Sequence, residues 1–231
     1  MTHTVTYGTT RIAFSIGYFE RKTLGIAVHP DGSVVVKAPC GATEQQIHQG
    51  VLHRAPWICK QQRYFREFGI HNPPRRYVSG ESHLYLGRQY MLRINKGSKN
   101  QVQYHSNILE VVCKDGTSAK KVLQEWYRER ASIKFNEYAK PIIERFKKYD
   151  VTPSSIEIRQ MKTRWGSCTM QDKITLNIEL IRAPRICIEY VITHELCHLV
   201  HKNHTKAFYA LISKEMPQWE RWKMKLEKAL V

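Results

Sequence analysis

The chain has 231 residues, of which 42% are hydrophobic and 25% are charged, and this composition excludes disordered, collagen-like and coiled-coil proteins. Lysine and arginine outnumber the acidic residues, and the formal net charge of +17 would attract phosphate polymers or acidic surfaces. The six cysteines form no CxxC pair, which argues against zinc-ribbon, thioredoxin-like and haem-attachment motifs.

The first half of the chain has a mainly strand-like pattern from residue 5 to about residue 115. Asp31-Gly32 lies between two β-branched runs and predicts a hairpin. Residues 43–68 interrupt the strands with a helix that Thr43 caps, with acidic and amide side chains in its first turn. Strands resume over residues 85–94 and 101–112. No internal repeat is visible in the sequence.

The second half changes to a helical period over residues 117–149. Two half-buried strands are then predicted over residues 155–161 and 173–178, on either side of the turn TRWGSCTMQD. A helix follows over residues 184–200, and the rest of the chain predicts two short helices that are broken at Pro217. This order of elements predicts an α+β fold.

We expect a cytoplasmic protein that does not enter a membrane. Cysteines without a pairing pattern favour a reducing compartment. The first residues lack the basic start and apolar run of a signal peptide, and no uncharged apolar run approaches the roughly 20 residues that a bilayer requires.

The residues that carry chemistry lie in the predicted helix over residues 184–200, which contains the sequence HELCH. At 3.6 residues per turn, His194 and His198 lie about 40° apart on one face and about 6 Å apart along the axis, so both can bind one metal ion. Glu195 lies about 100° further round, where it can accept a proton from a metal-bound water. This HExxH arrangement is typical of metallopeptidases.

Two histidines compete for the position of third ligand. On a straight helix His201 lies about 10.5 Å further along the axis than His194, too far for a bond of about 2.1 Å to the same ion. We favour His204, because Asn203 tolerates the left-handed conformation that can end a helix and turn the next side chain back. His201 is interpreted as a solvated or supporting imidazole, with substrate contact as the alternative.

The sequence HELCHLVHKNHTKAF and the preceding RWGSC resemble the YgjP-like zinc metallopeptidase family, whose HExxH zincin domain is similar to that of the SprT-like metallopeptidases. The resemblance continues in the same order through VHPDGSVVVKAP, APWICK and PRRYVSGESHLYLGRQY, and so covers nearly the whole chain. It implies one Zn²⁺ per chain, held by His194, His198 and His204, with Glu195 as the catalytic carboxylate. Tyr209 departs from the family, which usually has tryptophan there, and we expect this to change packing more than chemistry.

The resemblance also implies an architecture. A β-rich N-terminal part is expected to pack with a minimal zincin-like catalytic domain, made of a small sheet, an active-site helix and C-terminal helices. We place the boundary so that residues 1–116 are the β-rich part with one helix, and residues 117–231 are the zincin-like metallopeptidase domain.

The RWGSC segment has both structural and catalytic interpretations. Gly166 permits a tight turn and Trp165 supplies a large buried ring, so structure alone explains both. Arg164 and Ser167 are candidates for contact with the substrate or the transition state, because a guanidinium can stabilise oxyanion charge. Cys168 and Cys197 are interpreted as small buried side chains and not as ligands.

The predicted reaction is hydrolysis of a peptide bond by a zinc-bound water, with Glu195 as general base. A protein or peptide substrate could add a strand to an exposed sheet edge such as residues 155–161. Oligomeric state is left open by the sequence.

The alternative is a basic protein associated with nucleic acid. It would be either a protease that acts on DNA-bound proteins or a non-catalytic module with a structural metal, and its support is the net charge. Binding to DNA through the basic faces would fall steeply between low and moderate salt, and salt-insensitive or absent binding would remove the idea.

Overall fold

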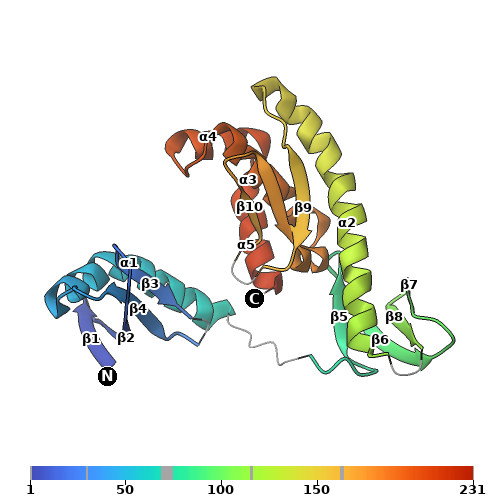
Figure 1. The fold of residues 1–231 in the computed structure, drawn as a ribbon, viewed down its shortest axis with the longest axis horizontal. Helices are drawn as coiled ribbons and strands as arrows, with labels where there is room; N and C mark the ends of the chain where they lie inside the picture. The colour runs from blue at the N-terminus through green and yellow to red at the C-terminus, as the bar shows by residue number, and fades with distance from the viewer. Residues whose placement is uncertain (1, 30, 69–74, 115–116, 162–163, 231) are drawn as a thin grey trace. The chain divides into compact units, whose positions relative to one another are not determined.

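The computed structural model describes residues 2–29, 31–68, 75–114, 117–161 and 164–230. The chain, drawn in Figure 1, forms two compact units, residues 1–73 and residues 74–230. Each unit has its own hydrophobic cluster. Helices and three small mixed sheets make the fold α+β, as predicted. Within the described residues, none of the helices is both long and apolar enough to cross a membrane.

The first unit is a four-stranded sheet covered by one long helix. Thr43 and Gln46 form a reciprocal cap at the start of the helix, since the backbone N–H of each residue donates to the side chain of the other. Gly32 has a φ of +82° in the turn between the third and fourth strands, so the predicted hairpin and helix are both confirmed. The elements are β1 (Thr2–Tyr7), β2 (Thr10–Phe19), β3 (Gly25–Val28), β4 (Val34–Pro39) and α1 (Glu44–Phe68), with the sheet order β1-β2-β4-β3.

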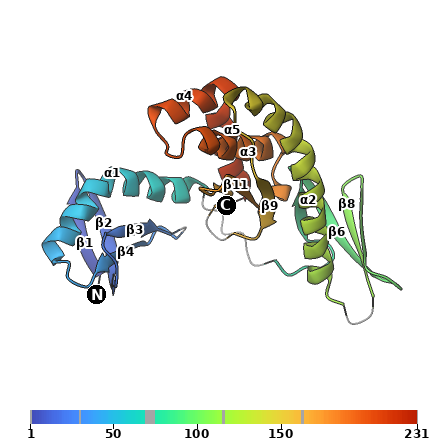
Figure 2. The same cartoon turned by 45° about the horizontal axis from the view of Figure 1, so that its top comes forward.

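The second unit begins with another four-stranded sheet and a long helix. The elements are β5 (Ser82–Tyr85), β6 (Arg88–Lys96), β7 (Gln101–His105), β8 (Ile108–Cys113) and α2 (Ala119–Phe146), with the sheet order β5-β6-β8-β7. Figures 1 and 2 show α2 running from this sheet past the next one. The hairpin of β5 and β6 is tied to the following part of the chain, because Leu86 N–H donates to Ile181 O and Gly87 N–H donates to Arg182 O.

The two four-stranded sheets repeat one topology, although no repeat is visible in the sequence. In each sheet the outer pairs are antiparallel, the central pair is parallel, and a long helix follows the last strand. When the two sheets are aligned by their strand registers, six buried positions of the first sheet correspond to six buried positions of the second. The matched residues are Val5 with His83, Ile12 with Tyr90, Phe14 with Leu92, Val34 with Leu109, Val36 with Val111, and Ala38 with Cys113.

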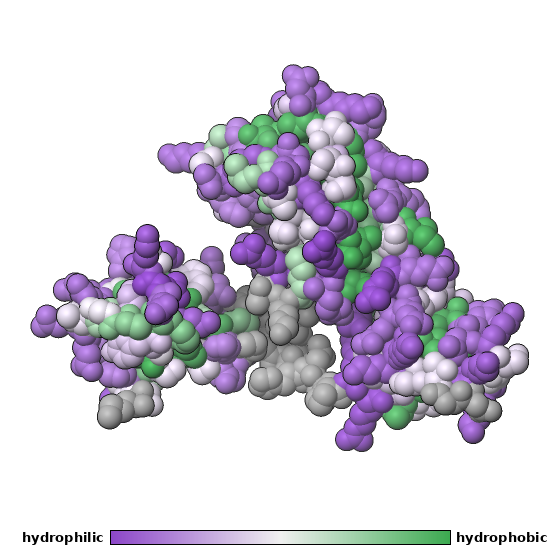
Figure 3. Space-filling model, viewed as in Figure 1, coloured by the Kyte–Doolittle hydropathy of each residue, from purple (hydrophilic) through white to green (hydrophobic). Residues whose placement is uncertain are grey.

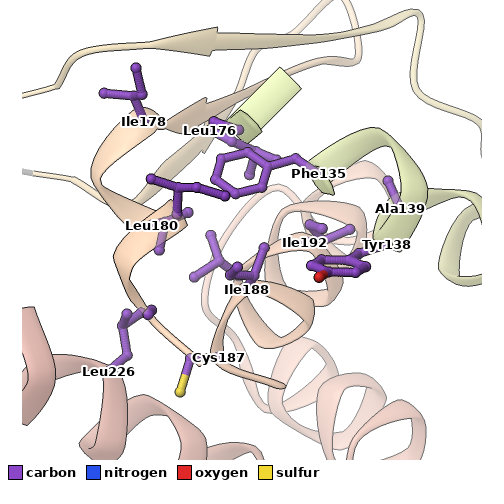
Figure 4. Packing of buried hydrophobic residues seen from close by; sticks show 14 of the residues in the cluster. Phe135, Tyr138, Ala139, Leu176, Ile178, Leu180, Cys187, Ile188, Ile192 and Leu226 are labelled. Atoms are coloured by element: carbon purple, nitrogen blue, oxygen red, sulfur yellow. The ribbon is translucent and has the colours of Figure 1, made fainter. Parts of the chain in front are cut away.

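A three-stranded sheet and three helices complete the second unit. Helix α2 packs against this sheet and against α3 (Arg185–Val200) through Phe135, Tyr138 and Ala139 (Figure 4). Burial of these apolar side chains holds the helix that carries the HExxH motif against the sheet. The elements are η1 (Lys147–Tyr149), β9 (Ser155–Arg159), β10 (Gly166–Cys168), β11 (Lys173–Asn177), η2 (Ile178–Arg182), α3 (Arg185–Val200), α4 (Lys206–Glu215) and α5 (Trp219–Leu230), with the sheet order β10-β11-β9.

The boundary expected between residues 116 and 117 falls inside the second unit, between β8 and α2. Strands β5–β8 lie with α2 because their side chains pack together. The rings of Tyr85 and Trp126 are 4.8 Å apart, and the Tyr127 hydroxyl donates to Leu84 O at 2.8 Å. As a division between functional domains, the boundary at 116 stays a prediction.

Candidate metal centre

Helix α3 presents the histidines on its cavity side because its other face is strongly apolar. Ile188, Ile192, Leu196 and Leu199 are buried, as the helical period predicts. The helix begins after Pro184, whose φ of −55° suits a helix start. This packing fixes the direction in which His194 and His198 project.

Three imidazoles converge at the end of this helix. One nitrogen from each of His194, His198 and His204 lies within 4.8 Å of the others, and Nε2 of His194 is 3.1 Å from Nε2 of His204. Ligand atoms on a tetrahedral ion with bonds of about 2.1 Å lie roughly 3.4 Å apart. The spacing therefore fits a single small metal ion, and a set of three imidazoles suits zinc.

The chain turns back after α3 to bring His204 to the cluster. His201 ends the helix in an extended conformation, with φ −129° and ψ 102°, and Thr205 caps α4 by accepting from Phe208 N–H. Asn203 does not have a positive φ. The prediction of a left-handed conformation at this residue is therefore wrong. Phe208 then packs against all three imidazoles, with ring centroids 4.6–5.0 Å away.

The surroundings orient His198 and favour the neutral form of His194 and His198. Nδ1–H of His198 donates to the carbonyl oxygen of His201 at 3.2 Å, which leaves Nε2 free to bind an ion. Burial, together with the neighbouring His198 and His204, lowers the pKa of His194 to about 3. Burial also lowers the pKa of His198, and the hydrogen bond to His201 opposes this only in part. Neutral imidazoles are the form that binds metal.

Glu195 lies beside the imidazoles and against the backbone of β10. Its side chain is buried, and burial raises the pKa of its carboxyl group to about 8, although Arg164 acts in the opposite direction. A Cβ atom at Gly166 would lie only 2.5 Å from Oε1 and 2.9 Å from Cδ of Glu195. From the sequence, Gly166 was expected in a tight turn. Instead Gly166 lies in a strand, has no positive φ, and leaves room for the carboxylate.

Strand β10 is the sheet edge that borders the metal centre. It pairs with β11 on one side only, and Gly166, Ser167 and Cys168 line the same cavity as the histidines. Strand β9, which the sequence analysis suggested for substrate pairing, is the opposite edge. It packs against α2 and lines neither cavity at the metal centre.

Asn177 is a supporting residue that the sequence analysis missed. It is buried, and its side-chain amide donates to the carbonyl oxygens of Met161 and Arg164 at 2.9 and 2.8 Å. These bonds hold the backbone of Met161 and that of Arg164, which lies two residues before β10. The signal that could have revealed it is a single amide in the apolar run ITLNIEL, because a buried amide needs partners.

Two neighbouring cavities open on the metal centre. The strand cavity, of about 620 Å³, is lined by β10 and the three histidines. The aromatic cavity, of about 320 Å³, extends toward α4 and α5. Arg164 lines both cavities and Ser167 lines the strand cavity, whereas His201 lines neither. Both cavities include Gly166, His194, Glu195 and His204.

The cysteines do not join the cluster. The possible metal-binding group found among the described residues consists of the three histidines and includes no cysteine. Burial raises the pKa of Cys197 to about 12 and also raises the pKa of Cys168, so both thiols stay protonated.

A family model described as YgjP-like, metallopeptidase domain, matches residues 22–229. The chain therefore belongs to the YgjP-like metallopeptidase family, and it is a metal-dependent peptidase that acts on proteins or peptides. The expected family is confirmed.

Two solved structures are similar to part of the chain. One is the metallopeptidase zymogen jannalysin of Methanocaldococcus jannaschii, with 20% identity and a TM-score of 0.38 over 42% of this chain and 90% of that one. The other is the metallopeptidase zymogen abylysin of Pyrococcus abyssi, with 21% identity and a TM-score of 0.34 over 40% of this chain and 99% of that one. No curated protein matches the chain.

Proposed function

We propose that the chain is a zinc-dependent peptidase in which His194, His198 and His204 bind one zinc ion and Glu195 is the general base. The observation that carries this proposal is the convergence of three imidazoles on one point, with the Glu195 carboxylate in the same cavity. A structural zinc normally has four protein ligands, whereas a catalytic zinc has three and keeps one position open. The three-histidine set therefore favours a catalytic ion.

The chain's own residues divide the chemistry between them. A bound zinc ion supplies a Lewis acid that lowers the pKa of a coordinated water to about 7 and polarises the substrate carbonyl group. Glu195 accepts the proton of the attacking water and passes it to the leaving amine. Its raised pKa supports this role, since a buried carboxylate accepts a proton more readily than an exposed one.

The edge of β10 is the proposed support for the substrate backbone. An extended peptide that adds to this edge would cross the metal centre, because residues of β10 and Glu195 line one cavity. Arg164 lines the same cavity, and its guanidinium can stabilise the negative charge that develops on the carbonyl oxygen of the substrate.

The ligand set is tested by counting bound zinc in two histidine variants. His204→Ala removes a proposed ligand, and we expect zinc affinity to fall by more than about 100-fold with loss of casein cleavage. His201→Ala is the control, because only its backbone carbonyl contacts His198. Equal zinc affinity in the two variants would contradict the proposed ligands.

Association with nucleic acid rests on the net charge alone and stays a prediction. Hydrophilic residues cover most of the face of residues 74–230 that is seen in Figure 3. A hydrophilic surface of this kind is common in proteins without a nucleic-acid partner.

A further inference from the structure

The aromatic cavity lies immediately beside the proposed catalytic groups. Its lining includes His194 and Glu195 together with Trp165, so any side chain inside it lies next to the reacting bond of a substrate. Residues of α3, α4 and α5 also line the cavity. All of these elements belong to the second compact unit.

Three stacked rings form the wall of this cavity. Trp219 of α5 stacks on Tyr209 of α4 with ring centroids 5.7 Å apart and an interplanar angle of 26°. It also stacks on Tyr190 of α3 at 6.4 Å and 14°. Trp219 is held in place because its Nε1–H donates to Ser213 Oγ at 3.0 Å. We call Tyr190, Tyr209 and Trp219 the aromatic wall.

Part of the aromatic wall is exposed and does not pack against other residues of the protein core. Tyr190 and Leu226 are buried in the hydrophobic core, but Tyr209 is 43% exposed and Trp219 is half-buried. Exposed aromatic surface next to a catalytic cavity is typical of a binding site for an apolar group. An apolar cavity of about 150 Å³ is enough to bind benzene, so about 320 Å³ accommodates a phenyl or indole ring.

The strand cavity has a different chemistry. Ser167, Thr169 and Lys202 line the strand cavity and not the aromatic cavity, and Lys202 pairs with Asp172 at 2.7 Å. A substrate that crosses the metal centre would therefore meet polar groups on one side. On the other side it would meet the aromatic wall, with the charged residues Arg164, Lys223 and Glu227 also lining that cavity. A charged side chain would lose its hydration against the wall, which disfavours it there.

We propose that the aromatic cavity binds a large apolar side chain, above all an aromatic one, on the substrate residue next to the scissile bond. The inference rests on the proposed peptidase function and adds a preference among substrates to it. Ring stacking on Tyr209 and Trp219, with removal of the substrate ring from water, would supply the preference.

The test separates binding from cleavage. The full chain carrying Glu195→Gln is loaded with zinc and titrated with a fluorescein-labelled octapeptide of glycine and serine that has phenylalanine at one central position. The same peptide with alanine at that position is the comparison, and fluorescence anisotropy gives Kd. We expect the phenylalanine peptide to bind at least about tenfold more tightly, which corresponds to about 1.4 kcal/mol.

Two variants assign this preference to the wall. Adding Tyr209→Ala or Trp219→Ala should reduce the ratio of the two Kd values to below about threefold. Met224→Ala is the matched control, since Met224 is on the same helix as Trp219, is 55% exposed and does not line the cavity, and it should leave the ratio unchanged.

Each result bears on the proposal. Equal Kd values for the two peptides, or a preference that survives both wall variants, would overturn it. If the phenylalanine peptide binds preferentially and the zinc-loaded wild type cleaves neither peptide nor unfolded casein, the cavity assignment stands and the peptidase function fails.

Discussion

At the scale of single residues, Gly166 decides whether Glu195 can occupy its place. A methyl group there would overlap the carboxylate, with Cβ 2.5 Å from Oε1. We expect Gly166→Ala to displace Glu195 and to lower kcat by about 100-fold, because a displacement of about 1 Å costs a rate factor of that size. Steady-state kinetics with zinc quantified in the same sample measures the effect.

Gly41→Ala is the matched control for this variant, since nothing lies within 4 Å of the Cβ position at Gly41. Both variants should keep bound zinc and a native circular dichroism spectrum. An unchanged kcat in Gly166→Ala would contradict this prediction, because it would show that the position of Glu195 does not require a residue without Cβ at 166.

The sequence could predict the local part of the metal centre and not the rest. His194, Glu195 and His198 share one helix, so 3.6 residues per turn fixes their directions. The contact of Gly166 with Glu195 joins residues that are 29 positions apart, and it depends on how β10 packs against α3. No local pattern contains that information. Although His204 was favoured, the structure makes the turn to it without the left-handed residue expected at Asn203.

At the scale of elements, Glu215 ties α4 to the end of α2. Its side chain is 2% exposed and contacts Arg145 at 3.0 Å, Lys148 at 2.8 Å and the Tyr149 hydroxyl at 2.6 Å. Glu215→Gln removes the charge that these groups share. We expect the free energy of unfolding at pH 7 to fall by about 1–2 kcal/mol, measured by urea denaturation.

The effect of this substitution should depend on pH. Burial alone would raise the pKa of Glu215, but the hydrogen bonds from Lys148 and Tyr149 and the charge of Arg145 lower it overall, below its ordinary value of 4.5. A lowered pKa in the folded state stabilises the protein above the unfolded-state pKa, and this contribution is lost as the pH falls through the folded-state pKa. The difference between wild type and variant should therefore shrink below about pH 4.

Glu144→Gln provides the comparison for Glu215. Glu144 pairs with Lys147 on the helix surface, with both side chains more than half exposed, and such pairs contribute less than about 1 kcal/mol. An equal loss of stability in the two variants would contradict the account of Glu215.

Elements with a strong local signal were predictable, and short ones were not. The helices over residues 43–68, 117–149 and 184–200 match α1, α2 with η1, and α3 closely. Strand β10 has three residues and was taken for part of a turn, because its pairing with β11 is non-local. The repeated sheet topology was not visible in the sequence, because the matched buried positions mostly share apolar character and not residue identity, and Val5 is matched with the polar His83.

At the scale of the whole molecule, two separate cores predict separate responses to mutation. Ile47 is fully buried in the cluster of the first unit, and Ile47→Ala should destabilise that unit by about 2–5 kcal/mol. Calorimetry should show one transition moved to lower temperature and another unchanged, with bound zinc retained. A single transition that moves as a whole would contradict the independence of the units.

The extent of each unit could not be predicted from the sequence. The boundary predicted near residue 116 follows the change from strand to helix pattern and stays a prediction for functional domains, whereas the compact units divide between residues 73 and 74. The contact of Tyr127 with Leu84 joins α2 to the strands before it. Such packing has no signal in composition or period.

The measurement that tests the central claim most directly is cleavage of unfolded casein by the zinc-loaded wild type beside Glu195→Gln, with zinc quantified in both. The account predicts about one zinc ion per chain in each protein, cleavage by the wild type, and at least a 100-fold lower rate in the variant. Cleavage by Glu195→Gln at the wild-type rate, or no cleavage by either protein with zinc bound to both, would contradict the account.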